Sequence, residues 1–214
     1  MATISVIDYG MGNIHSVAKA LQKVSDRKDK IYITSSIKEI KESSHIVFPG
    51  QGAAKSCMSN IRTNFDLNEL RDVFKTKYFL GICMGLQVLM TESDEGNGEK
   101  CLNIFTGKAR YLGDFQNAKL NLPHMGWNNI SLKKNHHIFS NIKDKSFFYF
   151  VHSYFVDPIN ESEILSTTNY GCTFTSGVSR DNFVALQFHP EKSSSDGLKA
   201  VSYTHLTLPT TRLV

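Results

Sequence analysis

The eleven residues KYFLGICMGLQ, at positions 77–87, run from an apolar strand through a glycine turn into a helical stretch. Their pattern Gly81-x-Cys83-x-Gly85 is the thiol form of the nucleophile elbow, a strained turn that exposes a nucleophile at the carboxyl end of a strand. Both glycines are needed because a Cβ at either place would clash with the tightly folded backbone. The turn also puts the sulfur at a helix N-terminus, which favours the thiolate. We therefore expect Cys83 to be a nucleophile and the backbone N–H of Met84 to be an oxyanion donor.

The segments around this turn alternate between strand and helix patterns. Strands are predicted from apolar and β-branched residues at 3–8, 31–34, 45–48 and 77–82. Helices are predicted over 13–24 with Asn13 as the cap, from Ser36 onward, over 53–76 and after Cys83. This alternation implies right-handed crossovers and an α/β fold, with a mostly parallel central sheet and helices on both faces.

The second half of the chain is richer in strand patterns. Strands are predicted at 147–156, 164–168, 172–176 and 183–189, and a final helix with serine caps at 193–200. No linker separates the two halves, so residues 1–200 are expected to form one domain with an added β-rich section. Residues 201–214 lack any helical or alternating period, and VSYTHLTLPT resembles a translated sequencing adapter. We expect a non-native tail there, with a genuine irregular tail as the alternative.

The overall composition is that of an ordinary globular chain. It has 214 residues, 41% hydrophobic and 21% charged, which excludes a disordered protein. A net charge of +4 is too small at this length to indicate nucleic-acid binding, and no window approaches the roughly 18 apolar residues of a membrane span. The N-terminus lacks the pattern of a signal peptide, which predicts a cytoplasmic protein. The four cysteines have no metal-site spacing, so we expect reduced thiols and no metal.

A base for the cysteine is indicated by the segment FVALQFHPEK at 183–192. His189 ends a predicted strand that Pro190 stops, and Glu191 can turn back to hold the imidazole in one tautomer. One histidine and one carboxylate are too few for a metal site. Gln87 lies four residues after Cys83, which puts both side chains on one helix face, so Gln87 can bind polar groups of a substrate.

These motifs resemble a known family. GICMGLQ at 81–87 and FHPEK at 188–192 resemble the catalytic motifs of the class I, or triad, glutamine amidotransferases. Within that family the resemblance narrows to the glutaminase subunits of imidazole glycerol phosphate synthase, the HisH group. It is carried by DYGMGNIHSV at 8–17, FPGQGA at 48–53, PHMGWN at 123–128, YFVHSYF at 149–155 and QFHPEKS at 187–193. The resemblance covers residues 3 to about 200 and implies the flavodoxin-like class I glutamine amidotransferase fold.

The resemblance implies a glutaminase reaction through a cysteinyl thioester, without a cofactor. Cys83, His189 and Glu191 would form its catalytic triad. The other site residues that it implies are a second oxyanion donor at Gly52, beside Met84, and substrate contacts at Gly50, Gln87, His152, Ser153 and Tyr154. The family more often has valine at position 51, so two roles stay open for Gln51, which can reach the site or face solvent.

The resemblance also implies a partner, a TIM-barrel cyclase subunit of the HisF type. The two subunits would form a heterodimer, in which ammonia from L-glutamine is used to make imidazole glycerol phosphate and aminoimidazole carboxamide ribonucleotide in histidine biosynthesis. The implied docking surface and ammonia exit comprise Met11, Asn13, Met125, Gly126, Trp127, Asn128, Tyr149 and Lys192. The alternatives are an amidotransferase subunit for another acceptor, a non-catalytic partner-binding module and, as the weakest, a cysteine peptidase.

Overall fold

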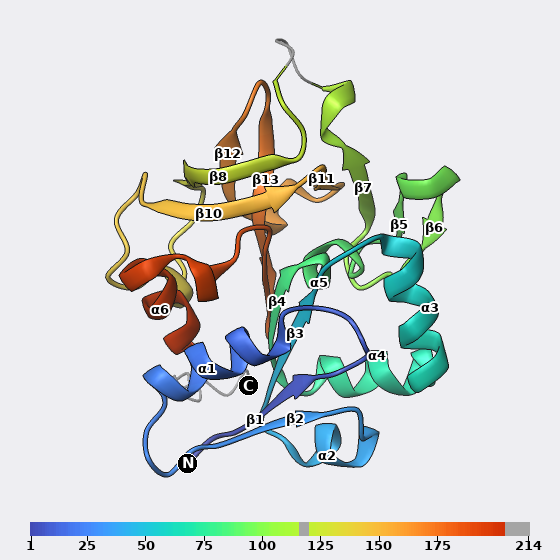
Figure 1. The fold of residues 1–214 in the computed structure, drawn as a ribbon, viewed down its shortest axis with the longest axis vertical. Coiled ribbons are helices and arrows are strands. Elements are labelled where there is room, and N and C mark those ends of the chain that lie inside the picture. The colour runs from blue at the N-terminus through green and yellow to red at the C-terminus, as the bar shows by residue number, and fades with distance from the viewer. Residues whose placement is uncertain (116–119, 204–214) are drawn as a thin grey trace.

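The computed structural model of the chain describes residues 1–115 and 120–203, and a large mixed sheet runs through its centre (Figure 1). The parallel part of the sheet has the strand order β2-β1-β3-β4-β14. Its strands are β1 (Thr3–Ile7), β2 (Lys30–Thr34), β3 (His45–Gly50), β4 (Tyr78–Cys83) and β14 (Phe183–Leu186). This arrangement confirms the expected parallel centre, because each predicted strand of the first half lies in it.

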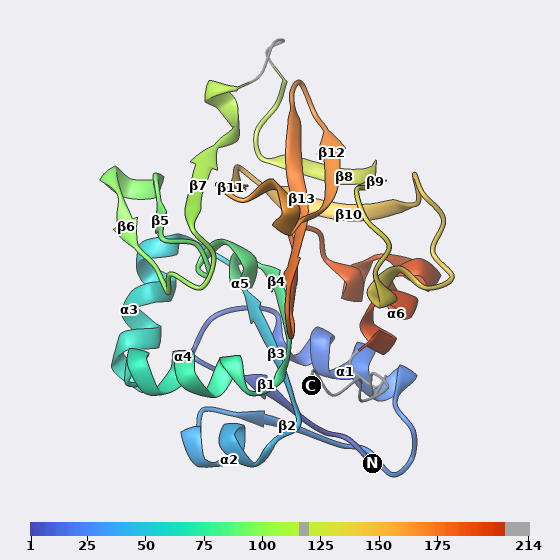
Figure 2. The same cartoon turned by 180° about the vertical axis from the view of Figure 1, so that it is seen from behind.

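A largely antiparallel extension continues the sheet beyond β14, in the order β13-β11-β7-β5-β6, and β12 joins β13 to β9. Its strands are β5 (Glu92–Ser93), β6 (Glu99–Lys100), β7 (Gly107–Tyr111), β9 (Ser131–Leu132), β11 (Tyr154–Pro158), β12 (Ile164–Asn169) and β13 (Thr173–Arg180). A separate two-stranded ribbon pairs β8 (His124–Asn129) with β10 (Phe147–His152). Figure 2 shows this ribbon beside the upper parts of β12 and β13.

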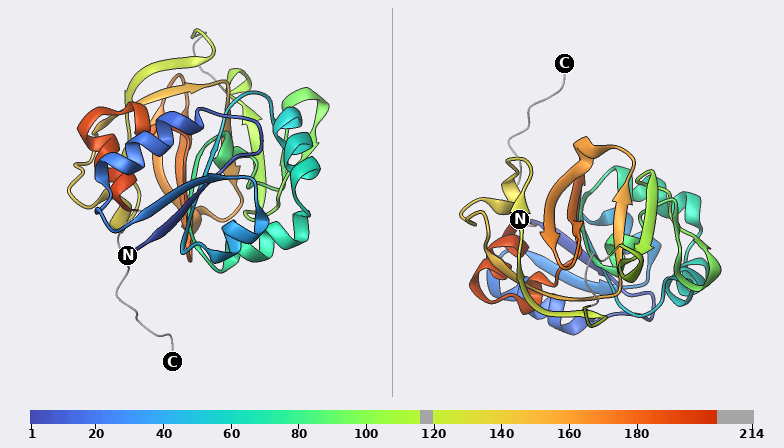
Figure 3. Two further views of the ribbon diagram at one scale, coloured as in Figure 1. Left: turned by 60° about the horizontal axis from the view of Figure 1, so that its bottom comes forward. Right: turned by 90° about the horizontal axis from the view of Figure 1, so that it is seen from above.

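Helices cover both faces of the parallel strands. Helices α1 (Ile14–Val24) and α6 (Ser194–Ser202) lie together on one side of the sheet, and α3 (Ala54–Asn64) and α4 (Leu67–Lys75) lie on the other (Figure 3). The shorter helices are α2 (Ile37–Glu42) and the single turn α5 (Met84–Gln87), with 3₁₀ turns η1 (Glu95–Asn97), η2 (Leu112–Asp114), η3 (His137–Phe139), η4 (Glu161–Glu163) and η5 (Pro190–Lys192). Among the described residues, none of these helices has the length and apolar character needed to cross a membrane.

Two hydrophobic cores form because neighbouring strand residues point to opposite faces. On β1, Val6 joins the core with Val17 and Leu21 of α1, whereas Ile7 joins the core with Met58 and Ile61 of α3. The parallel strands β1, β3, β4 and β14 are largely buried, whereas the edge strand β2 is partly exposed. The carboxyl ends of β3 and β4 lie at adjacent positions, where Gly50 pairs with Cys83.

Two elements differ from the sequence-based expectations. The predicted helix over 53–76 is two helices, because Asp66 interrupts it and caps α4 by accepting a hydrogen bond from the backbone N–H of Glu69 at 2.8 Å. The predicted strand at 147–156 is two strands in different sheets. Its chain leaves the ribbon after His152, which pairs with His124, and enters the large sheet at Tyr154.

Two predicted helix caps make no side-chain cap bond. Asn13 holds the N-cap position of α1 at φ −86° and ψ 60°. Ser193 precedes α6, but its hydroxyl donates to the carbonyl of His189 at 2.6 Å and accepts the N–H of Tyr149 at 2.9 Å. Ser193 therefore fastens the turn after β14 to the ribbon instead of capping the helix.

Helix α6 continues two residues beyond the predicted end at 200. Val201 and Tyr203 are both buried, and the Tyr203 ring lies 5.5 Å from that of His136. Residues 204–214 lie outside the described part of the chain, so a non-native origin of the 201–214 tail stays a prediction. The single domain over 1–200 also stays a prediction.

Candidate active site

Cys83 stands at a strained turn between β4 and α5. Its backbone has φ +56° and ψ −110°, a region that L-residues rarely occupy. The two flanking glycines are sterically required: a Cβ on Gly85 would lie 1.9 Å from the carbonyl oxygen of Phe48, and one on Gly81 would lie 2.9 Å from that of Gly85. The geometry is that of the predicted nucleophile elbow. The predicted helix after it, α5, makes a single turn.

His189 and Glu191 form a buried pair beside this turn. β14 is the parallel neighbour of β4, so the segment after β14 is brought to the same edge of the sheet as Cys83. Nδ1 of His189 lies 2.8 Å from Oε1 of Glu191, and the other ring nitrogen, Nε2, is buried without a hydrogen-bond partner. Burial alone lowers the pKa of His189, but interactions with Cys83 and Glu191 raise it to about 10. The arrangement favours an imidazolium beside the sulfur.

The turn that carries His189 is held by the ribbon strand β10. The backbone N–H of His189 donates to the carbonyl of Tyr149 at 2.9 Å, and the Ser193 hydroxyl bridges the same two residues from the other side. Pro190 begins the 3₁₀ turn that points Glu191 back to the imidazole. The turn of the predicted base is therefore fixed by three hydrogen bonds, two of which join it to Tyr149 of β10.

The elbow opens into a cavity of about 460 Å³. Among the described residues it is lined by Gln51, Gly52, Cys83, Met84, Gln87, Glu95, Pro123, Val151, His152, Ser153, Tyr154, His189 and Lys192. Most residues predicted to bind substrate or oxyanion are thus on its wall. Gly50 is not in that lining, because it packs beneath the turn, where a Cβ would meet the hydroxyl of Tyr9 at 2.4 Å. Gln51, whose role was open, does line the cavity.

The polar atoms of two buried glutamines connect the cavity wall to the sulfur of Cys83. Nε2 of Gln87 donates to the carbonyl of Tyr154 at 2.9 Å and to Oε1 of Gln187 at 3.2 Å, while Oε1 of Gln87 has no partner. Nε2 of Gln187 in turn lies 3.8 Å from the sulfur of Cys83. Gln87 was predicted to touch substrate; Gln187 was not predicted to have a role. The sequence could have indicated a role for Gln187, because Gln187 and His189 are two residues apart at the end of a strand pattern and therefore share one face.

Comparison with known proteins gives the site its family. A family model described as "Glutamine amidotransferase class-I" matches residues 5–206. The chain belongs to this family. Its relatives include the imidazole glycerol phosphate synthase subunit HisH of Hydrogenovibrio crunogenus, 45% identical over 196 residues that cover 92% of each chain. Subunit HisH 1 of Pseudomonas aeruginosa is 42% identical over 203 residues, 93% of this chain and 94% of the relative. The family expected from the motifs is thereby confirmed.

Solved structures confirm the amidotransferase fold. A crystal structure of a glutamine amidotransferase matches with a TM-score of 0.70 and covers 94% of this chain and 96% of its own, at 15% identity. The structure of PurLQS from Thermotoga maritima matches with a TM-score of 0.67, covering 95% and 97% at 15% identity. At such low identity the likeness bears on the fold alone.

The amidotransferase has one carboxylate on its cavity wall that sequence reasoning missed. Among the described lining residues, Glu95 is the only acidic side chain. Its Oε2 accepts the backbone N–H of Ala54 at 2.6 Å, at the start of α3, where the methyl side chain of the preceding Ala53 cannot cap the helix. Nothing in the local pattern around position 95 points to this role, because the contact joins segments 41 residues apart.

The residues predicted to dock a partner divide into two groups. Met125 and Trp127 of β8 are 62% and 52% exposed, and the Trp127 ring lies 6.3 Å from that of its cross-strand neighbour Tyr149. Nζ of Lys192, a residue of the cavity wall, lies 5.9 Å from the Tyr149 ring centre. Trp127, Tyr149 and Lys192 therefore form a row from the exposed face to the cavity. Asn128, by contrast, directs its amide inward to His124 and Asn169.

Met11 and Asn13 lie on the loop before α1. The Met11 methyl approaches the oxyanion turn so closely that a Cβ on Gly52 would be 2.8 Å from it. Gly52 itself has φ +93°, which glycine adopts without strain. A residue of the predicted docking surface therefore touches the predicted oxyanion donor directly. For Asn13 the structure gives only its place at the N-cap of α1.

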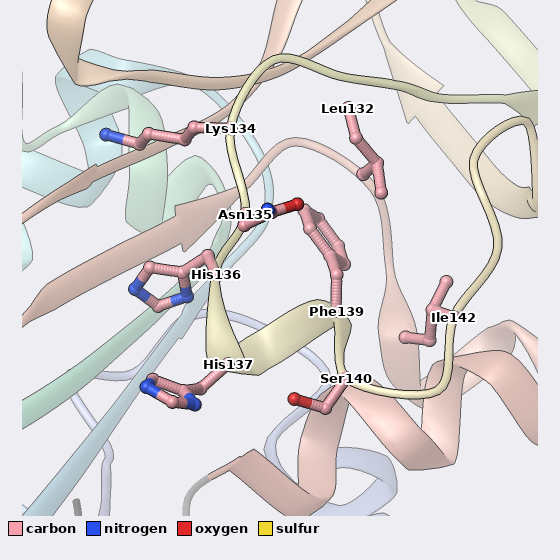
Figure 4. Close-up of a pocket in the computed structure, with 8 residues that line it drawn as sticks. All are labelled: Leu132, Lys134, Asn135, His136, His137, Phe139, Ser140 and Ile142. Carbon is pink, nitrogen blue, oxygen red and sulfur yellow. The ribbon is translucent and has the colours of Figure 1, made fainter.

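A second cavity of about 440 Å³ contains none of these residues (Figure 4). Its wall includes Lys134, His136 and Phe139 around the 3₁₀ turn η3. Two of its polar side chains are used within the fold: Lys134 donates to the carbonyls of Ser162 and Ser179, and Nδ1 of His136 accepts the N–H of Ile138. Across residues 1–115 and 120–203, no cluster of three or more His, Cys, Asp or Glu is arranged to hold a metal ion.

Proposed function

We propose that this chain is the glutaminase subunit of an imidazole glycerol phosphate synthase and that Cys83, His189 and Glu191 are its catalytic triad. The observation that carries the proposal is the buried His189–Glu191 pair beside a strained cysteine, at the head of a cavity with amide and carboxylate groups. Family membership and the names of the relatives support the same function.

The proposed reaction is acyl transfer to water. The thiolate of Cys83 attacks the side-chain carbonyl carbon of glutamine, and the N–H groups of Met84 and Gly52 donate to the tetrahedral oxyanion. His189 gives its proton to the leaving nitrogen, so ammonia departs and a glutamyl thioester remains. Neutral His189 then takes a proton from water, the water oxygen attacks the thioester, and glutamate leaves as the thiolate and the imidazolium re-form.

The groups on the cavity wall suit the ends of a glutamine molecule. The carboxylate of Glu95 suits the α-ammonium group of glutamine. Oε1 of Gln87 has no hydrogen-bond partner and can accept a hydrogen bond from the substrate. Backbone N–H groups at Ser153 and Tyr154 suit the α-carboxylate, since both residues line the cavity where the chain changes sheets. No metal or cofactor takes part in any of these steps.

The proposed partner is a TIM-barrel cyclase of the HisF type, which would use the ammonia. Trp127, Tyr149 and Lys192 form a row between the exposed face and the cavity, and this row supports an exit at the docking surface. A dry passage keeps ammonia unprotonated and therefore nucleophilic. The contact between Met11 and Gly52 supports a further expectation: docking of the partner settles the oxyanion turn, so the isolated subunit has little activity.

Glutamate release measured with the cyclase partner and its nucleotide substrate tests the proposal. Cys83→Ala is expected to abolish turnover, whereas Cys172→Ala, a cysteine outside the cavity lining, is expected to retain it. Unchanged turnover in Cys83→Ala would refute the assignment. Labelling of Cys83 by an electrophilic glutamine analogue separates the enzyme from a non-catalytic binding module, and full turnover with a different acceptor enzyme would favour another amidotransferase.

A further inference from the structure

Two buried histidines link the exposed ribbon to the wall of the substrate cavity. Nδ1 of His124 lies 2.9 Å from Nε2 of His152, and Nδ1 of His152 lies 2.8 Å from the carbonyl oxygen of Tyr154. At the other end, Nδ2 of Asn128 lies 3.2 Å from Nε2 of His124. The contacts form one continuous chain from Asn128 on β8 to Tyr154 on β11.

The direction of every hydrogen bond in this chain follows from the Tyr154 carbonyl. A carbonyl oxygen only accepts, so Nδ1 of His152 must carry its proton and, in the neutral ring, Nε2 must be an acceptor. Nδ1 of His124 must then donate to it, which leaves Nε2 of His124 to accept from the Asn128 amide. Asn128 is suited to this end of the chain because its NH₂ group has two donors, and it also donates to the carbonyl of Asn169 at 2.9 Å.

Burial keeps both imidazole rings neutral, as the directions of these hydrogen bonds require. His124 and His152 are 2% and 5% exposed. Burial lowers the pKa of His124 to about 4 and that of His152 to about 3, with His124 adding to the effect on His152. The His124 ring is also fixed from its faces, stacked at 4.1 Å on Tyr170 and at 4.8 Å on Phe150. The imidazoles are therefore held in one orientation and one tautomer.

The hydrogen-bond chain ends at the carbonyl oxygen of Tyr154, which also holds the side-chain amide of Gln87. The Tyr154 carbonyl accepts one hydrogen bond from His152 and a second from Nε2 of Gln87. A shift of His152 would alter the position of this carbonyl and, through it, the Gln87 amide on the cavity wall. At the far end, β8 carries the exposed Met125 and Trp127 on its outer face and His124 and Asn128 on its inner face.

We propose that His124 and His152 are positioning residues, which transmit the position of the exposed strand β8 through a one-way hydrogen-bond chain to the Tyr154 carbonyl and the Gln87 amide. The proposal rests on the glutaminase function proposed above. It assigns no proton transfer to either histidine. Their role is to set the geometry that the cavity wall presents to glutamine, and to make that geometry respond to whatever docks on β8.

The tautomers give a test that needs no activity. In ¹⁵N-labelled full-length protein, two-dimensional spectra of the imidazole nitrogens are expected to show both His124 and His152 neutral near pH 7, each with its proton on Nδ1. Asn128→Asp replaces the donor by an acceptor at the same place and is expected to move the His124 proton to Nε2. A proton on Nε2 of either ring in the unmodified chain would overturn the proposal.

Kinetics in the partner complex test the positioning role. His124→Phe keeps a stacking ring but removes the donor to His152, and we expect the KM for glutamine to rise about tenfold while kcat changes less, because a buried acceptor is left unpaired beside the binding wall. His124→Asn keeps an N–H near the place of Nδ1 and is expected to restore most of the KM. Tyr170→Phe retains the stacked neighbour and serves as the control, with an unchanged KM.

A purely structural role predicts a different pattern. In that case His124→Phe and His124→Asn would both lose thermal stability and active fraction, with the same KM as the unmodified protein, and the proposal would fail. Failure of the glutaminase function itself would be visible separately, as a lack of glutamate release by the unmodified complex. The tautomer measurement does not depend on that activity.

Discussion

The side-chain amide of Gln187 donates to the sulfur of Cys83 across 3.8 Å, and the same amide is oriented by Gln87. Gln187 is fully buried, so this hydrogen bond is protected from water. A donor aimed at sulfur stabilises the thiolate more than the thiol. The proposed nucleophile is therefore flanked by two groups that favour its thiolate, the His189 side chain and the neutral Gln187 amide.

Substitution of Gln187 should change the reactivity of Cys83 in a graded way. Gln187→Met has a similar volume without the donor, and we expect about a tenfold slower reaction of Cys83 with iodoacetamide at neutral pH, since a hydrogen bond to a charged group is worth roughly 1.5–3 kcal/mol. Gln187→Glu puts a like charge beside the thiolate and is expected to slow the reaction further. Equal rates in all three proteins would show that the amide does not influence the sulfur.

The four cysteines should differ sharply in their reaction with alkylating agents. Burial raises the pKa of the Cys57 thiol to about 11 and that of Cys101 to about 12, and it also raises the pKa of Cys172. These thiols remain protonated near neutral pH and are poor nucleophiles. Mass spectrometry after brief treatment with iodoacetamide is expected to find Cys83 modified first. Preferential modification of Cys172 would contradict the proposed thiolate at Cys83.

Glu191→Gln should lower kcat by about tenfold to a hundredfold and move the alkaline decline of activity to lower pH. Burial lowers the pKa of His189, while Cys83 and Glu191 raise it to about 10. Removal of the Glu191 charge removes one of the two groups that retain the proton. A pH–rate profile of the partner complex measures the shift, and an alkaline limb at unchanged pH would exclude this role of Glu191.

The same pair gives a pH dependence of stability with a definite sign. The folded pKa of His189 lies above the unfolded value of about 6.5, so its stabilising contribution is complete below that pH and is lost as pH rises towards 10. Urea unfolding should therefore find the stability difference between the unmodified chain and Glu191→Gln larger near pH 6 than near pH 10. A difference that grows with pH would contradict the assigned charge state.

The parallel half of the fold could be predicted because each strand and helix carries its own local pattern. The elbow is the best case, since its glycines are dictated by backbone contacts within a few residues of Cys83 and by the neighbouring strand β3. The strand at 147–156 shows the limit. Its strand pattern continues unbroken across Ser153, and the change of sheet there depends on pairing with β8 and β7, which are remote in sequence.

The site shows the same division between local and distant information. The short spacing of His189 and Glu191 made their pairing predictable. Glu95 and the His124–His152 chain were not predictable, because they join segments 41 and 28 residues apart by side-chain contacts that leave no periodic signal. The family resemblance places Gly50 in the substrate site, but it is absent from the cavity lining, and its close neighbours Tyr9 and Met84 show that it packs under the turn.

Gly85→Ala should destabilise the protein severely. The new Cβ would lie 1.9 Å from the backbone carbonyl oxygen of Phe48, and neither strand β3 nor the elbow can move away without breaking the pairing of β3 with β4. We expect a loss of more than about 4 kcal/mol in the free energy of unfolding, or no folded protein. Gly96→Asn is the control, since Gly96 has φ +64° with nothing within 4 Å of the added Cβ, and asparagine tolerates that conformation. Equal stability of both variants would refute the steric argument.

Trp127→Ala should weaken binding of the cyclase partner without loss of fold stability. The indole is 52% exposed and contacts Tyr149 edge-on, so little of the core depends on it. Aromatic residues of this kind dominate interface energies, and we expect an affinity loss of about 2 kcal/mol or more. Tyr32→Ala is the matched control: Tyr32 is 43% exposed on the edge strand β2, which lies near the bottom of Figure 1, whereas the ribbon lies in the upper part. Titration calorimetry with the partner should find the loss in Trp127→Ala alone; equal losses in both would place the docking surface elsewhere.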